Sequence, residues 1–420
     1  MSSYFISDRG PAKYFHGRTE IIDTFKSKLK LYRKENEGTT FLIQGAPGAG
    51  KTALLDVLSK HAKERGWKTA HIYPNALWNP HDLLPCLGKR SGRQITGLGL
   101  GGGIGNIIAA KFRLEIKPSA HTLIKLLQKQ KEPLLLVLDE AQTLGLKDVV
   151  PPEMKCIVIS VLKQIHNGDL GKPVMLLTAG LGTTEAAYGS LGISRFDGDC
   201  TVQLGRLDKK SECAVIRDWL IEDGRAKGDP QAWIQSIAEQ AHGWPQHIIS
   251  YIKPALKYLE SNSRFMTDEG LKFVLEEGAK YRETYYETRA HDIDEELREA
   301  LAIAVMDVPT DKTTTKSAIT SSLKKSGLTK KEAGKLFNQA LEKGIVDQRK
   351  DGDYGIPIPS FHTWLVDEYV RGKSQDIHQT PKLLPPKPTH ELPPPPMKDD
   401  VSEVKNKYKD KGRGGFRHER

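Results

Sequence analysis

One octapeptide constrains the fold of this chain more than any other stretch. Residues 45–52 read GAPGAGKT. The apolar run TTFLIQ (39–44) precedes them as a short buried strand would, and residues 51–66 follow with helical spacing and a closing glycine. Glycines let the backbone wrap closely, and the amides at the start of a helix point into the concavity. A strand, an anion-binding loop and a helix are therefore predicted in succession.

The spacing of this loop is that of a phosphate-binding loop, G-x-x-x-x-G-K-[ST]. The residues predicted to surround the phosphates of ATP are Gly45, Ala46, Pro47, Gly48, Ala49 and Gly50. Lys51 is predicted to reach the β- and γ-phosphates, and Thr52 offers a hydroxyl to Mg²⁺. Both ATP and Mg²⁺ are thus expected ligands.

Further apolar runs alternate with helical segments along the chain. Strands are predicted within KTAHIYP (68–74), PLLLVLDE (133–140), PVMLLTAG (173–180) and DCTVQLGRL (199–207), and a helix within residues 119–130. Runs that are apolar throughout are typical of strands buried on both faces of a parallel sheet. Alternating strands and helices predict an open α/β sheet with right-handed crossovers.

Polar residues follow two of these strands, at the sheet edge where ligands bind in open α/β folds. Asp139 is predicted to hold Mg²⁺, and Glu140 to orient and polarise the attacking water. The alternative for Glu140 is an acid that stabilises a helix N-terminus. Thr178 is predicted to contact the γ-phosphate or the water, with simple hydroxyl capping as its alternative.

The motifs in order are YFHGRTE (14–20), GAPGAGKT, LVLDEAQ (136–142), LLTAG (176–180), SRFDGD (194–199) and HGWPQHI (242–248). Over residues 12–260 the chain resembles an AAA+ ATPase. It is most similar to the origin-recognition/initiator-like branch and its bacterial relatives, which are close to the STAND signalling ATPases. The resemblance implies a P-loop NTPase sheet followed by a helical lid.

The resemblance also implies roles for residues outside the phosphate loop. Phe15, Gly17 and Arg18 match the segment that packs near the adenine. Family members often carry a sensor arginine in the lid, whereas this chain has Gly243, Trp244 and Pro245 there, and Pro245 is assigned to the nucleotide pocket.

Arg195 takes the place of the arginine that reaches the γ-phosphate of a neighbouring subunit in such ATPases. An arginine of this kind accelerates hydrolysis on the order of 10³-fold or more. The alternative is a local salt bridge to Asp197 or Asp199. The first interpretation implies a homo-oligomer or an ATPase partner subunit, with slow hydrolysis coupled to assembly.

Residues 291–372 predict a second fold. Helical patterns at 294–306, 315–327 and 328–344 precede a hairpin around residues 351–352 and a closing helix. This order is typical of a winged helix. Its recognition helix would be Lys330–Lys343, with Asn338 and Gln339 suited to reading adenine. The lysines and arginines that make the region basic are Lys330, Lys331, Lys335, Lys343, Arg349 and Lys350. Double-stranded DNA is the expected partner, and protein binding is the alternative.

The C-terminal tail (373–420) is expected to be disordered. Residues 375–400 are proline-rich and predict an extended spacer, with a protein partner as the second possibility. From Lys405 onward seven basic residues face two acidic ones, which is half of the net charge of +10. The predicted boundaries are therefore 1–205 for the ATPase sheet domain, 206–290 for the lid, 291–372 for the winged helix and 373–420 for the tail.

Other features exclude classes of protein. The glycine-rich segment 97–105 contains G-x-G-x-x-G, but no strand leads into it, so a dinucleotide site is rejected in favour of a surface loop, or a contact with DNA or a neighbour. The longest uncharged run, Gln94–Ala110, has 17 residues and is too short to span a membrane. Four scattered cysteines and a charged N-terminus predict a cytoplasmic protein.

Two functions remain after these exclusions. The first is an ATP-hydrolysing molecular switch that assembles on DNA through the winged helix. The second is a STAND-like signalling or defence ATPase, in which the C-terminal module and the tail bind protein partners.

Overall fold

A parallel sheet forms the centre of the N-terminal domain. The structure is a computed structural model that describes residues 12–72, 119–145, 152–291, 293, 295–306, 313–348 and 353–371. Its strands are β1 (Thr40–Gln44), β2 (Lys68–Ile72), β3 (Leu134–Leu138), β4 (Val174–Gly180) and β5 (Thr201–Gln203). They pair in parallel in the order β2-β3-β4-β1-β5, and each lies within a run predicted to be a strand. The predicted α/β fold class is confirmed.

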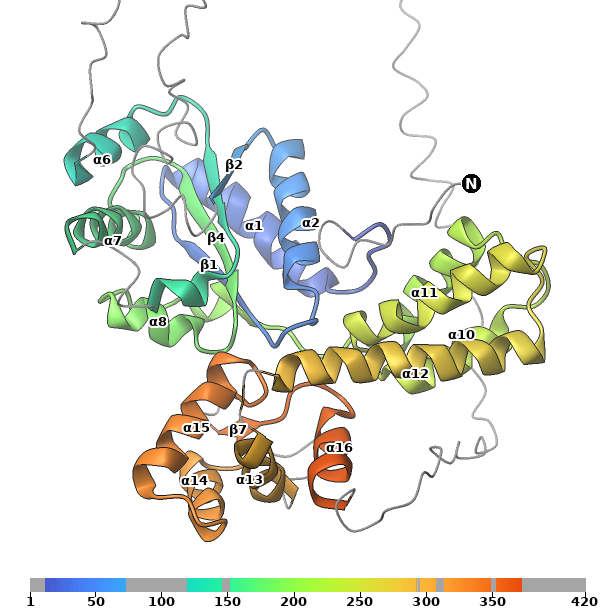
Figure 1. The fold of residues 1–420 in the computed structure, drawn as a ribbon. Helices are drawn as coiled ribbons and strands as arrows, with labels where there is room; N and C mark the ends of the chain where they lie inside the picture. Colours follow the sequence, from blue (N-terminus) through green and yellow to red (C-terminus); the bar gives the residue numbers. More distant parts are fainter. Residues whose placement is uncertain are drawn as a thin grey trace, which may run out of the picture. The chain divides into compact units, whose positions relative to one another are not determined.

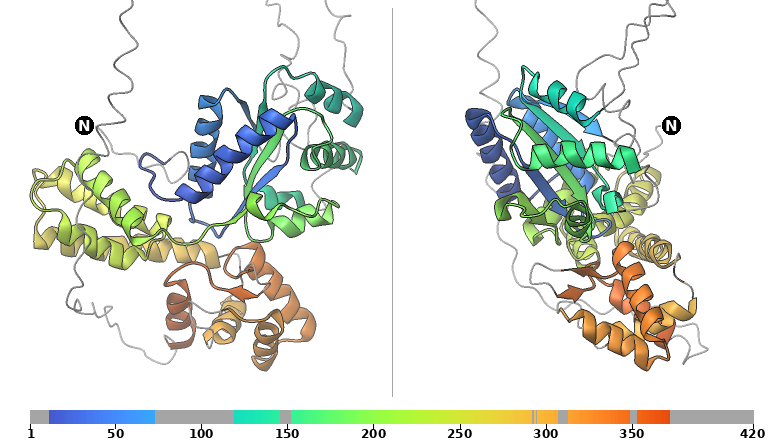
Figure 2. Two further views of the ribbon diagram at one scale, coloured as in Figure 1. Left: turned by 180° about the vertical axis from the view of Figure 1, so that it is seen from behind. Right: turned by 90° about the vertical axis from the view of Figure 1, so that its left-hand side faces the viewer.

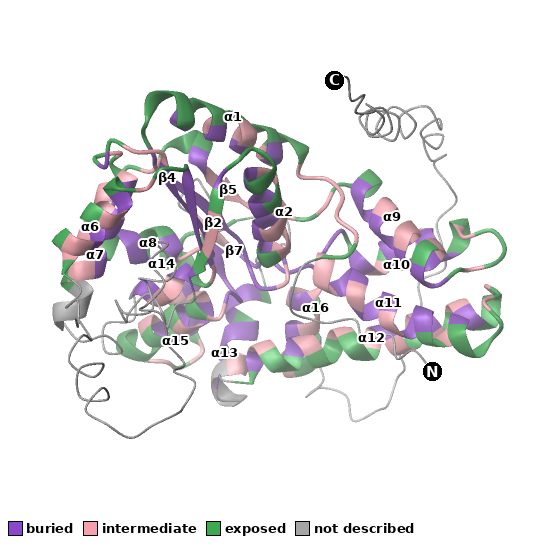
Figure 3. Cartoon of the chain, turned by 90° about the horizontal axis from the view of Figure 1, so that it is seen from above, coloured by how far each residue is buried: buried purple, intermediate pink, exposed green. Residues whose placement is uncertain are grey.

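Helices cover both faces of this sheet (Figures 1 and 2). One face carries α1 (Thr19–Glu35) and α2 (Lys51–Glu64), and the other carries α6 (Ala120–Gln128), α7 (Pro152–His166) and α8 (Thr184–Ser190). Alternate residues of β3 supply the two cores, because Leu135 packs with the α1 and α2 residues and Leu134 with those of α6 and α7. The strands are therefore buried, and the helices that cover them are partly exposed (Figure 3).

The lid is a helical layer with a core of its own. It contains α9 (Lys209–Asp218), the π-helical turn η4 (Trp219–Asp223), α10 (Gln231–Ala241), α11 (Pro245–Ser261) and α12 (Asp268–Ala290). Caps fix the helix starts: the Asp208 carboxylate accepts from the Ser211 amide, and the Thr267 hydroxyl accepts from the Gly270 amide. Pro245 occupies the first turn of α11, where a missing amide hydrogen costs nothing.

The C-terminal module comprises α13 (Glu295–Met306), α14 (Lys316–Lys325), α15 (Lys330–Glu342), β6 (Asp347–Gln348), β7 (Tyr354–Gly355), α16 (Phe361–Val366) and η5 (Asp367–Arg371). Helices and an antiparallel hairpin follow one another in the predicted order, and Thr329 and Glu332 form the predicted capping box. The winged-helix assignment and the domain boundaries stay predictions. The described residues, which end at Arg371, belong to one compact unit.

Several predicted features lie outside the described residues. These are the glycine-rich segment 97–105, Cys86, Arg349, Lys350 and the tail from residue 373. The three cysteines that the structure describes are free thiols. None of the helices in the described part of the chain is long and apolar enough to cross a membrane.

Candidate nucleotide site

The phosphate loop joins the end of β1 to the start of α2 as predicted. Gly48 and Gly50 adopt φ angles of 79° and 89°, a left-handed region that suits glycine. The Lys51 ammonium is folded back into the loop, where it donates to the carbonyls of Gly45 at 2.9 Å and Ala46 at 3.2 Å. Burial lowers the pKa of Lys51, and the nearby carboxylates of Glu140 and Asp139 oppose that effect. An ammonium held by carbonyls alone is ready to exchange them for phosphate oxygens.

The start of α2 is bonded directly to the end of β3. The Thr52 hydroxyl donates to the Asp139 carboxylate at 2.7 Å. A hydroxyl and a carboxylate side by side fit Mg²⁺, which prefers oxygen ligands and completes its shell with phosphates and water. No cluster of three or more His, Cys, Asp or Glu side chains suited to a metal is found among the described residues. The oxygens of Thr52 and Asp139 fit the ion by their chemistry, and their binding of Mg²⁺ stays a prediction.

Glu140 stands in an unusual backbone conformation. Its φ angle is 54°, in a region that few residues other than glycine occupy. Its amide donates to the Asp139 carboxylate at 2.9 Å, and its carbonyl accepts from the Thr143 hydroxyl at 2.8 Å. Strained backbone of this kind concentrates at functional sites. The conformation leaves the Glu140 residue exposed at the end of β3.

Gln142 is a residue that the sequence analysis missed as a member of the site. Its side-chain nitrogen donates to the Glu140 carboxylate at 2.5 Å, and its side-chain oxygen accepts from the Leu181 amide at 3.2 Å. One amide thus connects the segments that follow β3 and β4. The only sequence signal was its place in DEAQ, two residues after the glutamate.

Thr178 lies deeper than predicted. It is fully buried within β4, opposite Leu138 in the register, and its hydroxyl accepts from the Tyr188 hydroxyl at 3.1 Å. In this structure the hydroxyl faces Tyr188 of α8, away from solvent. A contact with phosphate or water by Thr178 stays a prediction that the geometry does not favour.

The lid packs directly on the phosphate loop. The Gln246 amide donates to the Gly48 carbonyl at 3.2 Å, and a side chain added at Gly48 would collide with Trp244, Gln246 and Tyr285. Pro245 lies 3.6 Å from the position of a Cβ added at Gly50. Pro245 thus lies beside the phosphate loop, and its place in the nucleotide pocket stays a prediction.

The N-terminal segment links the sheet domain to the lid. The Arg18 guanidinium donates to the carbonyls of Gly205 at 2.5 Å and Arg206 at 3.3 Å, and burial lowers its pKa. Gly17 has a φ of 79° and packs so closely on Ser211 that a side chain there would clash. Phe15 is half-buried against the core that contains the α1 and α2 residues. These residues bracket the connection between β5 and α9, and their contact with adenine stays a prediction.

With this geometry in place, the chain can be compared with known proteins. No protein-family model matches the sequence, and no curated protein is similar to it. The structure is similar to the Walker-type ATPase PABY2304 of Pyrococcus abyssi, with a TM-score of 0.55 and 13% identity over 86% of this chain and 99% of that one. It is also similar to the ADP form of the ORC2 protein of Aeropyrum pernix, with a TM-score of 0.53 and 14% identity over 87% and 97% of the two chains.

The chain has the P-loop AAA+ fold, which it shares with these two structures. At these identities the likeness is one of fold, and it spans the C-terminal module as well as the sheet and the lid.

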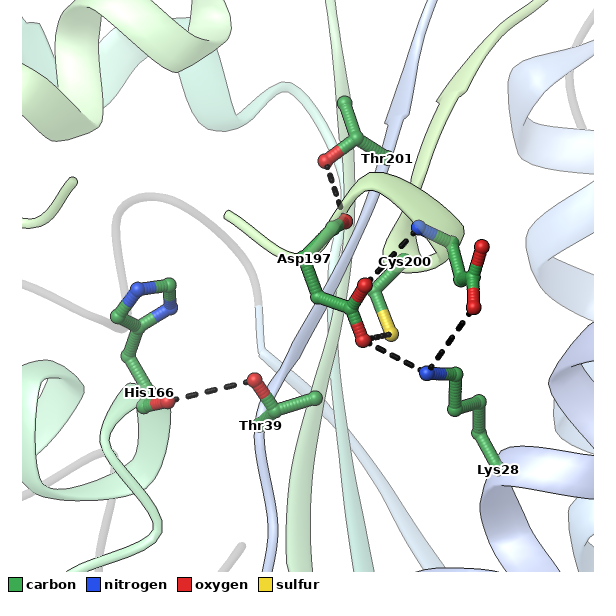
Figure 4. A network of polar contacts seen from close by, with 7 residues as sticks. Lys28, Thr39, His166, Asp197, Cys200 and Thr201 are labelled. Carbon is green, nitrogen blue, oxygen red and sulfur yellow. Dashed lines mark hydrogen bonds and ion pairs between the residues drawn. The ribbon is translucent and has the colours of Figure 1, made fainter. Parts of the chain in front are cut away.

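Within this AAA+ fold, the segment before β5 separates the two interpretations of Arg195. The Asp197 carboxylate accepts from the Lys28 ammonium at 2.6 Å (Figure 4), and Asp199 lies 3.6 Å from the same nitrogen. The bond to Lys28 lowers the pKa of Asp197. Both carboxylates that could have neutralised Arg195 are thus paired with Lys28.

Arg195 itself is exposed. Its φ is 67°, and no described residue forms a hydrogen bond or ion pair with its guanidinium. The neighbouring Phe196 ring anchors the segment, with its centroid 5.5 Å from Tyr188 and 4.8 Å from His166. The local salt bridge is therefore not formed, and the role of Arg195 at a neighbour's nucleotide stays a prediction.

The C-terminal module contacts the sheet domain beside the phosphate loop. The Gln203 side chain of β5 donates to the Asp347 carboxylate of β6 at 2.8 Å, and Asp347 is 3% exposed. Gly344 packs so closely on Pro47 that a side chain there would clash. The sequence analysis did not predict this contact.

The predicted recognition helix α15 presents lysines to solvent. Lys330, Lys331 and Lys335 are exposed, as is Asn338. Gln339 is half-buried, and its side-chain oxygen is buried without a hydrogen-bond partner in the described residues. Of the two amides suggested for reading adenine, Asn338 is accessible, whereas the Gln339 oxygen is not.

Proposed function

We propose that this chain is an ATP-binding and ATP-hydrolysing AAA+ switch that assembles with ATPase subunits on double-stranded DNA. The observation that carries the ATPase part is the Thr52–Asp139 hydrogen bond of 2.7 Å, which joins the phosphate loop to the acidic end of β3. Glu140 follows Asp139 directly and is held in a strained conformation. Phosphate binding, metal ligands and a candidate base therefore converge at one edge of the sheet.

The chemistry follows from the residues at that edge. Lys51 exchanges the carbonyls of Gly45 and Ala46 for phosphate oxygens and neutralises their charge. Mg²⁺, held by Thr52 and Asp139, would supply further neutralisation of the phosphate charge. Glu140 orients the attacking water and accepts its proton as a general base. Arg195 of a neighbouring subunit adds a second cation at the γ-phosphate, so that hydrolysis depends on assembly.

The Glu140→Gln variant tests the ATPase assignment. It keeps the size of the side chain and removes the base, so ATP turnover should fall about 10²-fold or more while ATP binding persists. Steady-state phosphate release and calorimetric ATP titration measure the two quantities. The matched control is Glu185→Gln, an exposed glutamate of α8. Equal turnover in the parent and Glu140→Gln would remove Glu140 from the mechanism.

The DNA part of the proposal is supported by the exposed lysines of α15. Lysines contact phosphates and give salt-dependent binding of low sequence specificity. The slow, assembly-coupled turnover expected of such a switch is part of the same proposal.

A STAND-like signalling ATPase is the second candidate. The bond between Gln203 and Asp347 favours it, because it docks the C-terminal module beside the phosphate loop, as a closed switch would require. Duplex DNA binding that weakens with salt supports the first function. Its absence from a chain that binds ATP would support the second.

A further inference from the structure

The last lid helix, α12, forms one wall of the phosphate loop. The Tyr285 hydroxyl of this helix donates to the Pro47 carbonyl at 2.8 Å. Burial raises the pKa of Tyr285 to about 12, so the hydroxyl keeps its proton at neutral pH. Residues near the C-terminus of α12 are therefore placed at the site where phosphates are expected.

Arg289 follows Tyr285 by four residues and thus lies on the same side of the helix. Its guanidinium carbon lies 5.4 Å from the centroid of the Tyr285 ring. No described residue forms a hydrogen bond or ion pair with it, and its Nε atom is buried without a partner. A guanidinium held over an aromatic ring with unused donors is prepared for a ligand with several oxygen acceptors.

The surroundings of Arg289 point to an anion. The Tyr285 ring that Arg289 faces is bonded through its hydroxyl to the Pro47 carbonyl and lies against Gly48, so Arg289 is held beside the phosphate loop that contains Lys51. The nearby carboxylates of Asp139 and Glu140 accept hydrogen bonds from Thr52 and Gln142 and form no ion pair with Arg289. Arg289 and Lys51 are thus two cations beside one loop, and a polyphosphate bound there would neutralise both.

We propose that Arg289 contacts the terminal phosphate of the ATP bound to its own chain. This inference rests on the proposed ATP-binding function. The lid has Gln246 after Pro245 and offers no cation in the contacts that it makes with Gly48. Arg289 supplies the missing charge from a different helix.

The position of α12 gives this contact a consequence. The helix packs along α11 and reaches α16 of the C-terminal module (Figure 1). Tyr286, adjacent to the phosphate-facing Tyr285, donates to the Pro359 carbonyl at 2.9 Å and packs against Phe361 and Trp364. A shift of Arg289 toward the terminal phosphate would therefore move α12, which contacts the C-terminal module.

The test compares binding of ADP and of the non-hydrolysable β,γ-imido analogue of ATP, each with Mg²⁺, by calorimetry on the full chain. Arg289→Met should weaken analogue binding about tenfold or more and ADP binding about twofold or less, because only the analogue carries a γ-phosphate for Arg289 to contact. Arg289→Lys should show a smaller loss of the same kind, since an ammonium cannot make the paired contact. Lys280→Met, an exposed lysine of the same helix, should match the parent.

Two outcomes would overturn the inference in different ways. If the parent binds both nucleotides and Arg289→Lys and Arg289→Met keep its ratio of the two affinities, Arg289 does not contact the terminal phosphate. If the parent binds neither nucleotide, the proposed ATPase function fails first, and the inference fails with it. Arg289→Lys keeps the charge and most of the volume, so it gives the ratio even if Arg289→Met does not fold.

Discussion

At the level of single residues, Glu140 shows how the backbone positions a side chain of the candidate site. A left-handed conformation costs a residue other than glycine about 1–3 kcal/mol. Three hydrogen bonds offset this cost: the Glu140 amide donates to Asp139, and its carbonyl accepts from the Thr143 amide and hydroxyl. Gln142 then restricts the carboxylate itself. The left-handed backbone thus orients the Glu140 side chain, and the neighbouring hydrogen bonds offset its cost.

Removal of the Gln142 amide should therefore reduce catalysis more than binding. In Gln142→Ala we expect kcat to fall about tenfold, because the carboxylate loses its orientation, while KM changes little. Steady-state kinetics give both constants. Gln128→Ala, an exposed glutamine of α6, is the control. A rise in KM at constant kcat would instead assign Gln142 to nucleotide binding.

The residues whose places in the fold the sequence predicted are those that depend on local spacing. GAPGAGKT and the acids after β3 work through positions in a strand–loop–helix unit, so sequence order was sufficient. Thr178 was placed at the strand tip, but the register puts it opposite Leu138, inside the sheet. Gln142 and Leu181 lie 39 residues apart, and no periodic pattern predicts that bond.

At the level of elements, α12 and α15 differ in what decides their roles. The start of α15 was predictable because its capping box lies within four consecutive residues. The role of α12 depends on its docking against Pro47, through a bond that spans 238 residues. Its sequence shows a helix, but only the folded chain shows that its C-terminal end lines the phosphate loop.

The exposed lysines of α15 carry the expected DNA binding. Lys331→Glu and Lys335→Glu should each weaken duplex binding several-fold and lower the slope of log affinity against log salt by about 0.9 for each lost phosphate contact. Fluorescence anisotropy over a salt series measures both. Lys272→Glu on α12 is an exposed control with the same charge change. Equal losses in all three variants would mean that net charge, and not α15, drives the binding.

At the level of the whole molecule, the strand-and-helix alternation predicted the parallel sheet but not the order β2-β3-β4-β1-β5. Strand order is set by crossovers between distant segments, which local patterns do not encode. The same holds for the contact between Gln203 and Asp347. The long-range contacts therefore determine how phosphate binding could be linked to the C-terminal module.

In the proposed function, assembly with a second subunit completes the site. In the described part of the chain the phosphate loop, the proposed metal ligands and the proposed base lie on one sheet edge, whereas Arg195 is exposed without a partner among the described residues. An unpaired arginine on a surface segment anchored by Phe196 is suited to a contact in trans. Full activity should then require a neighbour.

The most direct test is ATP turnover per monomer across a range of protein concentrations, with and without duplex DNA. The account predicts that turnover per monomer rises with concentration or DNA in the parent and in Arg225→Ala, a control in which the exposed arginine also has a left-handed backbone, with φ 47°. Arg195→Ala should bind ATP normally and stay at a low, concentration-independent rate. Turnover that is independent of concentration and DNA, and equal in the parent and Arg195→Ala, would contradict an assembling switch.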